Sequence, residues 1–407
     1  MSYPDHGLTE EERELRASAH GFAEQILRPA GIEIDRMPSA AVVARGAPLF
    51  RVIRQAADLG YTRMGGTPDL GGMALSPLSR YLVLEELSWG SVGIAAVLFL
   101  ASTHAEIALL SGNPALIEEF ARPYFGCQDG SILGCWAITE PDHGSDTLGP
   151  MRPELNVKAT GQLVSRRDGD HWVLRGQKSA WVSNGPIATH AMLNVQLEPK
   201  GTMADSGVCL LALDLPGISR GAPLEKHGLR SLPQGELFFD DVRIPARNMV
   251  IAIEGYSAYM HNHLSAFNAG VGCVATGLTR AAYECALAYC KERVQGGRPI
   301  CEHQSVRARL FRMFSLVQSC FALSRDVWVS NLTRIANGEI ARLELSIASK
   351  VYCTQAALEV ATLAVQLHGG NGMTKEYPVE MFLRDATALT IADGENAFLS
   401  QIAASLL

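Results

Sequence analysis

The order of segment types along the 407-residue chain is the feature that most restricts its fold. Residues 9–130 carry mainly helical patterns, and a Thr9–Glu12 capping box opens the first helix. Short β-prone runs bounded by Gly, Pro and Asp follow, and apolar residues then recur at helical spacing from Val306 to Phe321. The sequence therefore predicts a mainly α protein with a middle β domain, divided into residues 1–133, 134–247 and 248–407.

Local signals refine this division. A helical rhythm runs from Ser79 to Leu110 and is interrupted near Gly90. The β-prone runs of the middle part are 171–174, 207–215 and 236–239. The stretch 147–169 is rich in polar residues and glycine, so we expect an extended surface loop there.

Charge and hydropathy exclude several classes of protein. The net charge is −7 without any basic stripe, which argues against a nucleic-acid partner. The polar, acidic start does not resemble a signal or transit peptide. The longest apolar run, Val92–Ala101, is about half as long as a bilayer span requires, so no membrane insertion is expected. A cytoplasmic location is the resulting prediction.

Nine cysteines are scattered through the chain without a CxxC pair. This pattern favours reduced thiols over a disulfide framework. Clustered His, Cys and carboxylate residues at ligand spacing are also missing from the sequence, so no metal site is predicted.

Five motifs in the same order carry a family resemblance. The sequence similarity is to the acyl-CoA dehydrogenases, whose TEPxxGSD and GxKxWITNG signatures resemble the first two of these motifs. The motifs are CWAITEPDHGSD at 135–146, GQKSAWVSNG at 176–185, KHGLRS at 226–231 with 236–245, KER at 291–293 with 303–304, and QLHGGNG at 366–372 with 384–386.

The resemblance implies a helical N-terminal domain, a β-barrel-like middle domain and a C-terminal four-helix bundle. It also implies FAD bound between the β domain and the C-terminal helices, in a homodimer or homotetramer whose neighbouring subunit completes the site. An acyl-CoA or acyl-carrier thioester would be the substrate, and an electron-transfer flavoprotein would accept the electrons.

A flavin needs hydrogen-bond donors around N5 and its carbonyl oxygens. Thr139 and Ser183 offer hydroxyls, the backbone amides of Ile138 and Thr139 can meet the pyrimidine edge, and Trp181 offers a flat surface. Ser145 is predicted to contact the flavin or the thioester arm. The alternative reading is that these are ordinary core and strand residues. The complete predicted set for the cofactor is Trp136, Ile138, Thr139, Ser145, Trp181, Ser183, Arg293, Gln304, Gln366, Gly369, Gly370 and Glu395.

Arg293 and Gln304 stand where the family contacts the pyrophosphate and adenosine, often across subunits. A guanidinium suits a pyrophosphate because it is always charged and donates two bonds in a fork. Arg293 could instead be a solvated charge at a helix end. Gln366, Gly369 and Gly370 fit the same role, because glycine lets the backbone approach a cofactor closely.

The family's reaction requires a carboxylate to remove the proton next to the thioester carbonyl. Asp393 stands where many members carry Glu, so it is the predicted catalytic base despite being shorter by one methylene. Glu395 is the second candidate, with a helix-start carboxylate as its other reading. A second family branch places its base at the position of Phe267, which cannot act as one.

Three further departures from the family pattern are Asn268 in place of Arg, Gly296 in place of Phe, and Ala392 in place of an aromatic residue. Loss of the ring at Ala392 should widen the cavity, so we expect a bulky, branched or cyclic acyl group. The leading hypothesis is FAD-dependent α,β-dehydrogenation of an acyl thioester. The alternatives are a nitroalkane oxidase-like enzyme or flavin monooxygenase of the same fold, and a binding protein without catalysis.

Overall fold

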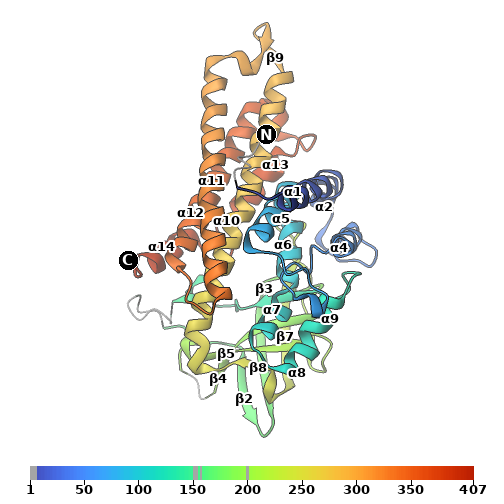
Figure 1. Ribbon diagram of the computed structural model, residues 1–407, viewed down its shortest axis with the longest axis vertical. Coiled ribbons are helices and arrows are strands. Elements are labelled where there is room, and N and C mark those ends of the chain that lie inside the picture. The colour runs from blue at the N-terminus through green and yellow to red at the C-terminus, as the bar shows by residue number, and fades with distance from the viewer. Residues whose placement is uncertain (1–6, 150–154, 156–157, 199–200) are drawn as a thin grey trace.

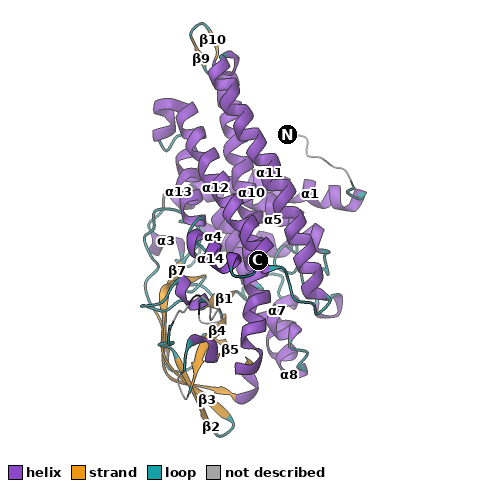
Figure 2. Ribbon diagram, turned by 90° about the vertical axis from the view of Figure 1, so that its left-hand side faces the viewer, coloured by secondary structure: helices purple, strands orange, loops and turns teal. Residues whose placement is uncertain are grey.

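The computed structural model of the protein describes residues 7–149, 155, 158–198 and 201–407. The molecule is elongated, and long helices run along its main axis (Figure 1). The strands of the middle region gather at one end of that axis, below the helices, and a short hairpin lies at the opposite end (Figure 2). This arrangement confirms the mainly α fold with a middle β domain. The three domain boundaries themselves stay a prediction.

The N-terminal region is helical, and its first helix begins with the expected capping box. The Glu12 amide donates to Thr9 Oγ1 over 3.2 Å, and the Thr9 amide donates to Glu12 Oε2 over 2.9 Å. The predicted interruption near Gly90 is present as the end of one helix. The helices are α1 (Glu10–Phe22), α2 (Arg28–Asp35), α3 (Ser39–Val42), α4 (Pro48–Asp58), α5 (Pro77–Gly90), α6 (Val92–Ala101), α7 (Thr103–Leu110), α8 (Pro114–Leu116) and α9 (Arg122–Gly126).

The apolar helical stretch is longer than the ten-residue run seen in the sequence. It spans Val92–Leu110, which is 19 residues and apolar enough to cross a membrane by length and composition alone. However, 72% of its most apolar window is buried inside the fold. Core helices pass the same test, so this one is weak evidence for a membrane span, and the cytoplasmic location stays a prediction.

The middle region forms one twisted eight-stranded sheet. The path runs β6-β7-β3-β2-β4-β5-β8, and β1 pairs with β4 in parallel. Alternate side chains of the strands are buried in an apolar core that is separate from the core of the helices. Leu174, Leu193 and Leu237 are examples from three strands. The strands are β1 (Gly134–Ala137), β2 (Val164–Asp168), β3 (His171–Ser183), β4 (His190–Leu197), β5 (Ser206–Ala212), β6 (Ile218–Arg220), β7 (Gln234–Pro245) and β8 (Met249–Ile251).

The expectation of a loop over 147–169 is wrong for its second part. Val164–Asp168 is strand β2, paired antiparallel with the start of β3. Gly169 adopts φ +58 in the connecting turn, which allows a tight hairpin despite the polar sequence. Residues 150–154 and 156–157 lie outside the described part of the chain.

The C-terminal region is a bundle built around a 40-residue helix. The predicted periodic residues Leu310, Met313 and Val317 are buried, which confirms the helix they indicated. At the tip of the bundle, Gly296 and Gly297 adopt φ +60 and +80, and this turn explains the glycine in place of Phe. The elements are α10 (Ile253–Glu292), hairpin strands β9 (Val294–Gln295) and β10 (Arg298–Pro299), α11 (Gln304–Ala336), α12 (Leu343–His368), α13 (Val379–Leu389) and α14 (Asn396–Ala404).

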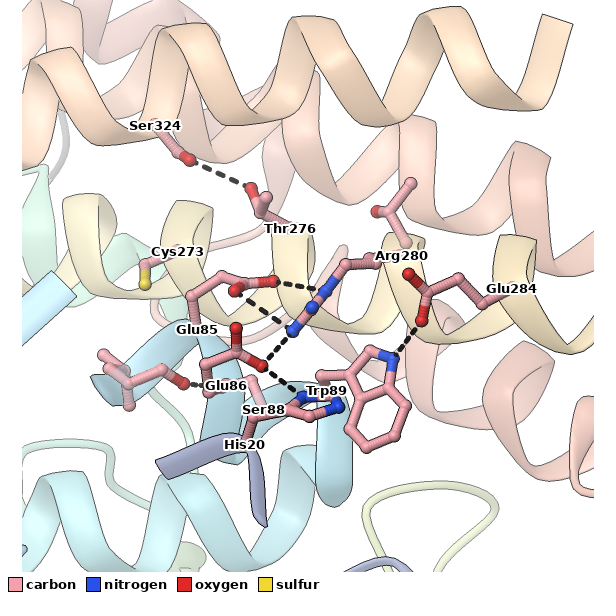
Figure 3. A network of polar contacts seen from close by, with 12 residues as sticks. His20, Glu85, Glu86, Ser88, Trp89, Cys273, Thr276, Arg280, Glu284 and Ser324 are labelled. Carbon is pink, nitrogen blue, oxygen red and sulfur yellow. Dashed lines mark hydrogen bonds and ion pairs between the residues drawn. The ribbon is translucent and has the colours of Figure 1, made fainter. Parts of the chain in front are cut away.

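A buried ion cluster joins α10 to the N-terminal helices (Figure 3). The Arg280 guanidinium contacts Glu85 over 3.1 Å and also contacts Glu86, and all three side chains are at most 4% exposed. His20 of α1 binds Glu86 over 2.8 Å, and this hydrogen bond raises the pKa of the imidazole. The indole of Trp89 donates to Glu284 over 2.8 Å. The cluster thus links α1, α5 and α10.

Candidate active site

A cavity of about 540 Å³ opens where the sheet meets the segment between α13 and α14. This volume lies within the usual range for small-molecule sites. Its walls come from β1, β3, the turn at Ser145–Leu148, the 226–229 segment, α10 and the end of α13. The lining residues are Leu100, Trp136, Ile138, Thr139, Gly144, Ser145, Thr147, Leu148, Trp181, Ser183, Lys226, His227, Gly228, Leu229, Gln234, Leu264, Thr387, Ala388, Ile391, Ala392, Asp393 and Gly394.

The sheet presents an aromatic surface and hydroxyl groups to this cavity. Trp181, at the end of β3, is 59% exposed, which is unusual for so large an apolar side chain. The Thr139 hydroxyl shares a 2.8 Å hydrogen bond with Ser179, and the Ser183 hydroxyl accepts from Gln234 over 3.0 Å. Trp136 also reaches the wall, but it is only 8% exposed and its indole N–H donates to Asn194.

The segment from Lys226 to Leu229 forms a second wall and is held against α13. The Leu229 amide donates to the Asp385 carboxylate over 2.6 Å, and Arg384 donates to the carbonyl of His227 over 2.9 Å. A Cβ at Gly228 would lie 2.2 Å from the Arg384 carbonyl oxygen. Only glycine permits this approach, which explains the glycine of the KHGLRS motif.

Asp393 lies in the turn between α13 and α14 and lines the cavity. Its φ of +52° belongs to the left-handed region, which costs energy for a residue other than glycine. Desolvation by the cavity walls raises the pKa of the Asp393 carboxyl to about 6, while the nearby Lys350 lowers it in part. The pKa of the Asp393 carboxyl is therefore close to neutral pH, which is where a general base works best.

Glu395, the second candidate base, has another task. Its carboxylate is exposed and accepts hydrogen bonds from the amides of Ala397 and Phe398 over 2.9 and 3.0 Å, which caps α14. Its own amide donates to Ser145 Oγ over 2.9 Å. Glu395 does not line the cavity, and this arrangement matches the helix-start reading.

Helix α10 lines the cavity with Leu264 and places Phe267 against the wall residue Trp136. Phe267 is 5% exposed and packs on Trp136 and Phe99, with ring centroids 4.7 and 5.4 Å away. Next to it, the buried Asn268 donates to the carbonyl of Asp393 over 3.4 Å. Asn268 thus contacts the backbone of the Asp393 turn, at the position where an arginine was expected.

Three family models match successive parts of the chain. They describe the N-terminal domain of acyl-CoA dehydrogenase at residues 9–125, the middle domain at 135–242 and the C-terminal domain at 254–407. The chain belongs to the acyl-CoA dehydrogenase family.

Individual family members resemble the whole chain. Cyclohex-1-ene-1-carbonyl-CoA dehydrogenase of Syntrophus aciditrophicus is 29% identical over 389 residues, covering 96% of this chain and 88% of that protein. The structure of butyryl-CoA dehydrogenase from Megasphaera elsdenii is 26% identical, with a TM-score of 0.84 over 100% of this chain and 99% of the other. An active-site mutant of nitroalkane oxidase shares the fold alone, with 22% identity and a TM-score of 0.86 over 98% and 95% of the two chains.

Besides Glu395, five predicted cofactor residues do not line this cavity. Two of them flank the β9–β10 hairpin and three lie at or just after the C-terminal end of α12, whereas the sheet is at the opposite end of the molecule from that hairpin (Figure 1). All five residues are exposed. They are Arg293, Gln304, Gln366, Gly369 and Gly370. Within one subunit, therefore, the structure does not bring the two parts of the predicted cofactor site together.

Sequence reasoning missed three polar residues around the cavity. Lys226 lines the wall and donates to Gln234 over 2.7 Å, and burial lowers the pKa of its amine to about 7. Lys226 begins the KHGLRS motif and Gln234 lies between that motif and residues 236–245, so their place in the sequence was a usable signal. Lys350 is fully buried on α12 beside the Asp393 turn. Its signal was the single lysine or arginine in the α12 sequence.

The residues of the cavity fit a flavin. An exposed indole and the hydroxyls of Thr139 and Ser183 stand beside a carboxyl group in one space. Flat aromatic surface and hydroxyl donors suit a planar, hydrogen-bonding ring system. Members of the acyl-CoA dehydrogenase family are FAD flavoproteins.

Proposed function

We propose that the protein catalyses FAD-dependent α,β-dehydrogenation of an acyl-CoA thioester, with Asp393 as the base. One observation carries the proposal: Asp393 lines the same cavity as Trp181, Thr139 and Ser183. FAD, when bound, supplies the acceptor for the hydride that leaves the β-carbon. The protein supplies the base that removes the α-proton.

The chain's own residues prepare this proton transfer. Asp393 would take the proton at its carboxylate, which is sheltered enough to have a raised pKa. Ser145, from the turn at Ser145–Leu148, and Asn268, from α10, hold the backbone of its turn. Apolar walls such as Leu148 and Leu264 would exclude water, which strengthens the electrostatic interactions that stabilise developing charge on the thioester oxygen.

We further propose that a neighbouring subunit completes the cofactor site in a homo-oligomer. Arg293 and Gln304 are exposed at the far end of the bundle, where they are available to a second copy of the chain. An electron-transfer flavoprotein is the proposed acceptor of the electrons, as the family resemblance implies.

The acyl group is proposed to be bulky, branched or cyclic. Ala392 adds only a methyl group to the cavity wall beside the base, where the family pattern has a ring. The cyclohex-1-ene-1-carbonyl-CoA dehydrogenase relative, whose name specifies a ring-bearing acyl group, agrees with this proposal.

An anaerobic titration of the flavin-loaded protein tests the function. Thioesters from butyryl-CoA and octanoyl-CoA to branched and cyclic acyl groups are added, and the same acyl groups are offered on an acyl carrier protein. We expect loss of the oxidised flavin absorbance with branched or cyclic acyl-CoA. Preference for butyryl- or octanoyl-CoA would contradict the bulky acyl group alone. No bleaching by any thioester, with rapid oxidation of the reduced flavin by oxygen, would favour the oxidase alternative.

The pH dependence of flavin reduction provides a second prediction. Proton removal requires ionised Asp393, whose pKa is raised to about 6. The rate is therefore expected to fall as pH decreases through about 6 and to level off above about 7. Stopped-flow reduction between pH 5 and 8.5 measures this limb. If the midpoint of this fall in rate lay near the ordinary pKa of aspartate, about 4, the raised pKa of the base would be contradicted.

A further inference from the structure

We propose that Lys350 is a positioning residue for the catalytic base, and that its ammonium group binds the Asp393 turn from inside the bundle. The proposal rests on the function proposed above. It assigns a role to a residue of α12 that does not line the cavity.

Lys350 has an acceptor for each of the three N–H donors of its ammonium group. Its side chain is fully buried, and Nζ donates to the Gly394 carbonyl over 2.7 Å, the Thr390 carbonyl over 3.2 Å and Asn396 Oδ1 over 2.6 Å. Thr390 precedes Asp393 in the turn, Gly394 directly follows it, and Asn396 is the first residue of α14. One side chain therefore spans the whole turn.

The pattern of partners indicates the charged state of Lys350. All three are oxygen acceptors, and an ammonium group has three N–H donors and no acceptor. Asn396 presents its oxygen because its amide nitrogen donates to Thr354 Oγ1 over 3.1 Å. A neutral amine would direct a lone pair at one of the oxygens, so this contact pattern favours a protonated lysine. Burial lowers the pKa of the Lys350 amine to about 8, so the cation is present at pH 6 and is partly lost by pH 8.5.

A second side chain holds the turn from the opposite helix. Asn268 of α10 donates to the Asp393 carbonyl, so the carbonyl oxygens of Thr390, Asp393 and Gly394 all accept side-chain hydrogen bonds. Asp393 itself holds an unfavourable φ of +52°. Such a conformation persists only where the surroundings over-determine it, which Lys350 and Asn268 do together.

Lys350 also sets the charge that the base experiences. The other charged or titratable groups near Asp393 are Glu395 on the same turn, and Lys226 and His227 across the cavity. From α10 the contact is Asn268, which carries no charge. Lys350 is therefore the cation that favours ionised Asp393 from the bundle side, and it lowers the pKa of that carboxyl group.

Lys350→Met and Lys350→Gln test the proposal through the pH profile of flavin reduction. Both remove the cation, and Gln retains part of the hydrogen bonding. We expect the acid limb to move up by about one pH unit, because an opposite charge nearby shifts a pKa by about one to three units. The rate at pH 6 should then fall about fivefold more than the rate at pH 8.5. Amide hydrogen exchange of residues 390–396 should also rise in Lys350→Met.

Ser346→Ala is the matched control, because Ser346 is fully buried one turn earlier on α12 and accepts from Asn331 rather than from the turn. It should leave the acid limb in place. A uniform rate loss in both Lys350 variants, without a shift of the limb, would overturn the positioning role. If Asp393→Asn reduces flavin as fast as the unsubstituted protein, the proposed base fails instead, so the two failures are distinguishable.

Discussion

Asp393→Asn is expected to lower the rate of flavin reduction by the preferred acyl-CoA by about 10³-fold, the middle of the range for loss of a general base. The amide is nearly isosteric with the carboxylate but cannot accept the α-proton. The hydrogen bonds from Asn268 to the carbonyl of residue 393 and from Lys350 to the Gly394 carbonyl should persist. Stopped-flow reduction at pH 8 measures the rate, and the oxidised flavin spectrum checks that the cofactor remains bound.

Glu395→Gln is the matched control for this result. It makes the same carboxylate-to-amide change two residues away, on a side chain whose oxygens cap α14 rather than face the cavity. A glutamine oxygen can still accept one of these bonds, so the rate should change less than about tenfold. A large loss in Glu395→Gln together with a fast Asp393→Asn would reverse the assignment of the base.

Arg280→Met is expected to cause the largest loss of stability. It leaves the carboxylates of Glu85 and Glu86 buried without their guanidinium partner (Figure 3). Breaking a buried ion pair from one side costs about 3–5 kcal/mol, because a charge stays in the interior uncompensated. Urea denaturation followed by circular dichroism measures the free energy of unfolding.

Two comparisons show whether buried charge is the cause. Arg312→Met removes an equally well-formed pair with Glu359 at 2.7 Å, but both side chains are over 40% exposed, so its denaturation midpoint should barely move. Adding Glu85→Gln and Glu86→Gln to Arg280→Met should recover part of the loss, since no unpaired carboxylate then stays buried. Equal losses for Arg280→Met and Arg312→Met would argue against this explanation.

The sequence predicted the architecture well because local and family signals agreed. The Thr9 capping box, the break at Gly90 and the periodic residues of α11 each appear as expected. Strand β2 escaped prediction because its arginines and serine are polar, and its pairing with β3 depends on a turn glycine rather than on apolar alternation.

The candidate site was harder to read, because its polar supports lie far from its motifs. Six residues predicted at the cofactor and the predicted base line one cavity, and their roles stay predictions. Arg293 and its companions occupy the other end of the bundle, and no pattern within one chain states which surfaces of two copies meet. Lys350 carries no motif, since its importance arises only when helix packing places it beneath the Asp393 turn.

The hydrogen bond from Glu395 to Ser145 closes a loop of 250 residues, and that from Leu229 to Asp385 closes one of 156. Each closure loses chain entropy before any local contact compensates, so contacts of this range form late in folding. We therefore expect the complete cavity only in chains in which these long-range contacts have formed. Any molecule that bridges its walls binds the native state alone, so it raises the melting temperature in proportion to the logarithm of its concentration.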